Sequence, residues 1–139
     1  MGRVTVEIRV ESLGDLIKQD EGTLAPEQVR TVVIPDALVD TGATMLALPT
    51  SAIRKLGLKQ IFTKRTMNAS GPVEVAIHQA VRLTIMDRFC TLDVMEVPDG
   101  VPALVGQIPL EQLDFVVDMQ GRKLTGNPAH GGEHMFELY

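Results

Sequence analysis

The sequence has few aromatic side chains and almost no cysteine. Its 139 residues include no Trp, one Tyr, four Phe and a single cysteine, Cys90. One cysteine excludes an intrachain disulfide, so nothing in the sequence implies an oxidising compartment. Cys90 alternates with Leu92 and Val94, a pattern that predicts a core side chain and not a nucleophile. With so few aromatic residues, any substrate pocket is expected to be largely aliphatic.

Long hydrophobic runs and clusters of positive charge are also missing. No apolar stretch approaches the roughly 18 residues that a membrane span requires. The first residues alternate between apolar and polar instead of forming the apolar core of a signal peptide. The net charge is −5 and the 13 basic residues are scattered, whereas phosphate binding needs clustered Lys and Arg. We therefore expect a cytoplasmic protein with neither a nucleic-acid nor a membrane partner.

The length and the absence of linkers predict one domain over residues 1–139. A chain of this size buries roughly 68% of the surface that its unfolded form exposes. The sequence contains no internal repeat, no low-complexity segment and no Pro/Gly/Ser-rich stretch that would divide it. The predicted domain is therefore large enough to hold a hydrophobic core of its own.

Most of the chain shows the period-two alternation of half-buried strands. Apolar and polar residues alternate over Val4–Val10, and again in three runs separated by turns between Phe62 and Val97. Pro49–Gly57 and Pro109–Leu113 fit short helices. Ser12–Pro26 is irregular and holds at most a short helical turn. The pattern predicts an all-β fold, mainly strands with one or two short helices.

The most informative segment runs from Ala37 to Thr44 and reads Ala-Leu-Val-Asp-Thr-Gly-Ala-Thr. An apolar approach ends in Asp40, which is followed by Thr41 and Gly42. A carboxylate that leaves a packed strand and enters a tight turn is held rigidly and partly shielded from water, as catalysis requires. A second apolar segment, Leu104-Val105-Gly106, precedes the later short helix.

Together these segments resemble the retropepsin-like aspartic proteases, which are single-domain and homodimeric and carry an Asp-Thr-Gly-Ala loop. The likeness extends over roughly Val4 to Pro128, and it includes a long hairpin between the two segments. It implies the closed β-barrel of the acid-protease fold. Aspartic protease chemistry needs two facing carboxylates. This chain has one Asp-Thr-Gly and no Asp-Ser-Gly, so the resemblance implies a homodimer.

The resemblance also implies roles for the loop residues. Asp40 of each subunit would flank one water and share one proton, because two like charges about 3 Å apart do not both ionise cheaply. Thr41 would hydrogen-bond across the two-fold axis. Gly42 would allow the turn and leave a backbone acceptor facing the substrate. Ala43 stands where pepsin-like enzymes usually place a hydroxyl, which predicts a less acidic pH optimum than that of pepsin.

The expected substrate is a peptide or an unfolded protein, and the resemblance implies that a flap closes over it. Viral members often pair an acid at the position of Thr44 with an arginine at that of Gln107. Here both are neutral, which leaves no unpaired buried charge. The predicted substrate-binding residues are Ala43, Thr44 and the flap tip Met67, Asn68, Ala69, Ser70 and Gly71. Apolar candidates for lining a pocket are Leu46, Leu48, Met67, Val73 and Ile108.

The C-terminal segment offers a weak metal motif and an apolar tail. His130 and His134 have the His-x-x-x-His spacing of helical zinc sites. Gly131 and Gly132 lie between them and oppose a helix, so we expect neither a metal nor a cofactor. The tail Met135–Tyr139 is expected to form a strand, either in the dimer interface or at the edge of its own domain.

Two other functions remain open at the level of sequence. Asp40 in isolation is also compatible with a turn residue that accepts hydrogen bonds from Gly42 or Ala43. The chain would then be a non-catalytic dimeric peptide-binding module of the same fold, or a small structural β protein. The intact Asp-Thr-Gly favours the protease over the binding module. The later Leu104-Val105-Gly106 segment argues against the structural protein.

Overall fold

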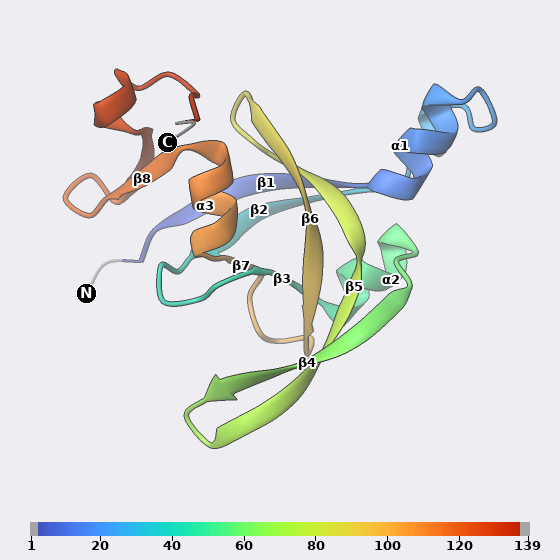
Figure 1. Cartoon of the computed structure of the whole chain (residues 1–139), viewed down its shortest axis with the longest axis horizontal. Helices are drawn as coiled ribbons and strands as arrows, with labels where there is room; N and C mark the ends of the chain where they lie inside the picture. Colours follow the sequence, from blue (N-terminus) through green and yellow to red (C-terminus); the bar gives the residue numbers. More distant parts are fainter. Residues whose placement is uncertain (1–2, 137–139) are drawn as a thin grey trace.

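The computed structural model describes residues 3–136, which fold mainly as strands (Figure 1). The strands are β1 (Thr5–Ser12), β2 (Thr31–Val39), β3 (Leu46–Pro49), β4 (Gln60–Asn68), β5 (Gly71–Ile85), β6 (Arg88–Val97), β7 (Leu104–Val105), β8 (Phe115–Asp118) and β9 (Lys123–Gly126). The helices are α1 (Leu13–Asp20), α2 (Thr50–Leu56) and α3 (Gln107–Leu113), with 3₁₀ turns at Pro26–Gln28 and Pro128–His130. The predicted all-β class is confirmed, with three short helices where one or two were expected.

The main sheet closes on itself. Its strand order is β1-β2-β7-β3-β6-β5-β4, and β1 also pairs with β5. Six strands therefore form a ring, and β4 lies outside it as the second arm of a hairpin with β5 (Figure 1). This arrangement confirms the predicted closed barrel.

The ring encloses the hydrophobic core. Alternate residues of the strands point inward, and their side chains are removed from water. Cys90 belongs to this core, and its burial raises the pKa of the thiol to about 11. The largest fully buried side chains are Ile8, Leu46, Leu48, Leu56, Ile77, Leu83, Ile85 and Leu113.

The segment expected to be irregular contains a true helix, α1. Ser12 caps it by accepting a hydrogen bond at Oγ from the backbone N–H of Asp15, 3.2 Å away. The Asp15 carboxylate in turn receives the side chain of Arg30, with 2.8 Å between Oδ2 and Nε. These bonds anchor α1 to the start of β2, at the end of the molecule opposite the C-terminal segment (Figure 1).

The chain after α3 forms a small sheet of its own. Strands β8 and β9 pair antiparallel, with Phe115 opposite Gly126, and residues 127–136 follow as a 3₁₀ turn and irregular chain. We refer to residues 127–136 as the C-terminal arm. Met135 and Phe136 are not part of a strand, and the rest of the predicted terminal strand lies outside the described residues.

Candidate active site

The acid loop, residues 40–45, connects β2 to β3 and begins at Asp40. The backbone N–H of Asp40 donates to the carbonyl of Val105 over 3.0 Å, and Ala43 N–H donates to the carbonyl of Asp40 over 3.1 Å. Gly42 N–H donates to Asp40 Oδ1 over 2.9 Å. Asp40 is half-buried, whereas Thr41 and Gly42 are exposed. The loop therefore holds the carboxylate in one orientation at the surface of the chain.

Strand β7 explains why the loop is rigid. It lies between β2 and β3, parallel to the first and antiparallel to the second, so it supports both ends of the loop. The first residues of α3 extend this support. Gln107 N–H donates to the carbonyl of Ala43 over 2.8 Å, and Ile108 N–H to that of Thr44 over 2.9 Å. Two amides that a helix cannot satisfy internally are thus used to fix the loop.

Gly106 lies between β7 and α3, where there is no space for a side chain. Its N–H donates to the carbonyl of Met45 over 3.1 Å. A Cβ at this position would lie 2.6 Å from that oxygen and 2.7 Å from the carbonyl oxygen of Ala43. Its φ of −87° is open to any residue, so close approach and not backbone conformation demands glycine. The apolar-apolar-Gly signature therefore has a direct physical cause beside Asp40.

The structure does not join Thr44 and Gln107 through their side chains. Both residues are exposed, and Gln107 Nε2 donates to Glu111 Oε1 over 3.0 Å along α3. The hydrogen bonds between this part of α3 and the acid loop run through the main chain. The neutral pair therefore leaves no charge unpaired at the edge of the site.

The expected flap is the tip of the β4–β5 hairpin, which projects from the ring (Figure 1). Asn68 pairs with Gly71 across a two-residue turn formed by Ala69 and Ser70. Asn68 Oδ1 accepts the N–H of Ser70 over 2.8 Å, and Gly71 has a φ of 113° that favours glycine. Met67 is 73% exposed, so an apolar side chain stands free at this tip.

The predicted pocket residues separate into three groups. Leu46 and Leu48 are both fully buried, but only Leu46 borders the hollow beside the acid loop, so the expectation that Leu48 lines it is wrong. Met67 and Val73 lie in the hairpin. Leu46 and Ile108 line a hollow of about 310 Å³ next to the acid loop, together with Met45, Leu92, Asp93 and Pro109. The sequence did not reveal this hollow, because its walls come from β3, β6 and α3.

The two histidines of the C-terminal arm bind protein groups. His130 Nδ1 lies 2.6 Å from Asp114 Oδ2, and His134 Nε2 lies 3.0 Å from the carbonyl of Gln112. Residues 3–136 contain no group of three or more His, Cys, Asp or Glu side chains arranged to hold a metal ion. In that same range, no helix is long and apolar enough to cross a membrane.

The fold and the loop identify the class of protein. The family model described as aspartyl protease matches residues 23–118, more than half of the chain and all of the region from β2 to β8. The chain therefore belongs to the aspartyl protease family, which confirms the recognised resemblance. No curated protein matches it in sequence.

Proposed function

We propose that the protein is a homodimeric aspartic endopeptidase whose site is built from Asp40 of two subunits. One observation carries the proposal: a single Asp-Thr-Gly loop, exposed at the surface, is held in place by β7 and by the first amides of α3. A lone carboxylate cannot serve as both base and acid in the same step. A second copy of the loop, facing the first, supplies the missing group.

The mechanism follows from two carboxylates that share one proton. The ionised Asp40 takes a proton from a water held between the subunits, and the resulting hydroxide attacks the peptide carbonyl. The protonated Asp40 polarises that carbonyl and then protonates the leaving nitrogen. Gly42 N–H already donates to Asp40 Oδ1, which fixes the orientation of the carboxylate before substrate arrives.

The other loop residues take positioning roles in the proposal. Thr41 is exposed, and in the proposed dimer it hydrogen-bonds with the loop of the second subunit. Ala43 and Thr44 flank the path of an extended substrate, and the hairpin tip Met67–Gly71 closes over it. The hollow beside Met45 and Ile108 accepts an aliphatic side chain of the substrate. The proposed unit is one domain, residues 1–139, acting on peptides or unfolded proteins in the cytoplasm.

One hydrogen bond of the acid loop also fits a second function. The Gly42 N–H to Asp40 Oδ1 bond is also the bond of an ordinary turn-capping aspartate. A non-catalytic dimeric module of the same fold would bind extended peptides without cutting them. The same loop geometry serves both functions, so cleavage itself is the measurement that separates them.

The deciding experiment compares wild type with Asp40→Asn on a library of unfolded proteins between pH 4 and 7. The matched control is Asp36→Asn, which changes an exposed carboxylate on β2 four residues before Asp40. We expect cleavage by wild type and Asp36→Asn and none by Asp40→Asn. Cleavage that survives Asp40→Asn would remove Asp40 from the mechanism. Binding without cleavage by wild type would establish the peptide-binding module.

A further inference from the structure

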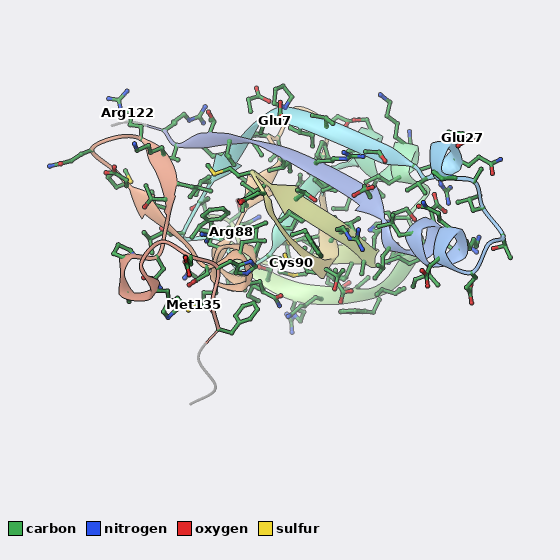
Figure 2. The ribbon with its side chains drawn as sticks, turned by 90° about the horizontal axis from the view of Figure 1, so that it is seen from above. Glu7, Glu27, Arg88, Cys90, Arg122 and Met135 are labelled. Atoms are coloured by element: carbon green, nitrogen blue, oxygen red, sulfur yellow. The ribbon has the colours of Figure 1, made fainter. Side chains whose placement is uncertain are left out.

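A buried polar centre lies at the end of α3 remote from the acid loop, formed by Arg88 of β6 and Asp114. Figure 2 shows Arg88 close to Cys90, at the inner side of the C-terminal region that contains Met135. The inference drawn from this centre rests on the proposed function, because it concerns how Asp40 is held.

Arg88 is only 9% exposed, and its guanidinium binds main-chain oxygens of two segments. Nη1 donates to the carbonyls of Leu113 and Asp114, over 2.9 and 2.8 Å, and Nη2 donates to the carbonyl of Gly132 in the arm. The guanidinium also stacks 4.5 Å from the centre of the Phe115 ring. One side chain therefore joins β6, the end of α3 and the arm.

Asp114 holds the arm from the other side. Its carboxylate receives Asn127 Nδ2 over 3.2 Å, His130 Nδ1 over 2.6 Å and the backbone N–H of Met135 over 3.1 Å. These hydrogen bonds hold the pKa of the Asp114 carboxyl below its usual range, and the one from His130 has the largest effect. Asp114 itself adopts a left-handed φ of 58° directly after α3. An aspartate that accepts three bonds from the arm ties the arm to the end of the helix.

Helix α3 connects this centre to the acid loop. It has seven residues, two turns, and both of its ends are bonded to other segments. Its first amides donate to the carbonyls of Ala43 and Thr44, and its last carbonyl, that of Leu113, accepts from Arg88. Close-packed interiors transmit strain, so we expect a shift at one end of this short helix to reach the other end.

We propose that Arg88 and Asp114 are positioning residues for Asp40, and that they act by clamping the C-terminal arm onto α3. The clamp fixes α3, and α3 fixes the two carbonyls that shape the acid loop. The family model ends at residue 118, before the arm begins at residue 127. The match to the family therefore does not cover the arm.

The first test is Arg88→Met, which keeps an unbranched side chain against Phe115 and removes every donor. We expect kcat to fall at least tenfold with KM unchanged, because small misplacements of a catalytic group are costly. Amide exchange at Gln107 and Ile108 should accelerate, while exchange in β5 should not. The control Ile53→Val loosens the core at α2, which contributes no residue to the clamp. A loss of kcat no larger than that of Ile53→Val, measured on folded protein, overturns the inference.

The second test displaces the arm and leaves Arg88 and Asp114 intact. A Cβ on Gly126 would overlap the carbonyl oxygen of Gly132, so Gly126→Ala pushes the arm away. We expect the same loss of kcat as in Arg88→Met. Gly14→Ala is the matched control, since its Cβ would meet nothing closer than 3.8 Å. An unchanged kcat in Gly126→Ala overturns the role of the arm.

Failure of this inference and failure of the proposed function give different results. Wild-type protein that cleaves no substrate overturns the proposed function, and the positioning role falls with it. Wild-type cleavage that Asp40→Asn abolishes and that Arg88→Met and Gly126→Ala leave intact overturns the positioning role alone.

Discussion

Position 106 shows how one residue type follows from space alone. Gly106 approaches two carbonyl oxygens of the acid loop more closely than any side chain permits, although its backbone conformation is ordinary. The sequence therefore carried a real signal at Leu104-Val105-Gly106. The strand β7 has only two residues, and propensity alone does not place so short a strand between β2 and β3.

Gly106→Ala is expected to destabilise the fold and disturb the acid loop. The new Cβ would lie 2.6 Å from the carbonyl oxygen of Met45, which is backbone and cannot swing aside. Overpacking of this kind costs about 1–3 kcal/mol. Urea unfolding of the variant beside Gly14→Ala measures the difference. Equal stability of the two variants would contradict the close approach.

Ala43→Ser is expected to shift the acidic limb of the pH–rate profile of the proposed protease to lower pH. The added hydroxyl would stabilise the ionised carboxylate at the site, so activity would persist further into acid. The measurement is kcat/KM from pH 2 to 8 for wild type and variant. A wild-type optimum below about pH 3 would contradict the argument, because the wild type lacks this hydroxyl.

Among the elements, α1 shows what the sequence analysis missed. Ser12 and Asp15 have the spacing of a helix cap, but Gly14 inside the first turn and the helix's length of eight residues obscured the signal. The ion pair between Asp15 and Arg30 anchors the helix, and it joins residues fifteen positions apart. Helix propensity over a window of eight residues carries no information about so distant a contact.

The Asp15–Arg30 pair is expected to make stability depend on pH. The hydrogen bond from Arg30 lowers the pKa of Asp15 from 3.8 to about 2, so folding favours the ionised form. The stabilisation is complete above pH 4 and is lost as the pH falls through 4 to 2. It amounts to about 2 kcal/mol. Urea unfolding of wild type and Asp15→Asn at pH 2 and pH 6 tests this. A difference in free energy of unfolding between the two proteins that is the same at both pH values would contradict it.

Of the two elements proposed to contact substrate, the hairpin turn follows from local sequence and the hollow does not. The turn at residues 68–71 was visible in the sequence, because Asn and Gly have well-defined turn preferences. The hollow beside the acid loop was not, since it depends on how α3 packs against β3 and β6. Leu48 was misassigned for the same reason. Alternation shows that one face of a strand is apolar, but not whether that face meets the core or a pocket.

For the whole molecule, the proposed shared site predicts an activity that depends on protein concentration. Specific activity should fall on dilution, because a single subunit carries one Asp40. An excess of Asp40→Asn should suppress wild type by forming mixed dimers with one acid. An excess of Asp36→Asn should not. Specific activity that stays constant on dilution to a monomer, measured by sedimentation, would contradict the shared site.

The closure of the ring has a consequence for how the chain folds. Strand β1 pairs with β5 over Arg9–Ser12 and Val81–Thr84, so the first strand must wait for residues some seventy positions later. Such distant pairing slows folding and leaves strand edges open in the meantime. On the ribosome, the N-terminal strand would emerge long before its second neighbour. We therefore expect production of this protein to benefit from a low expression level, which lowers the concentration of chains whose early strands are still unpaired.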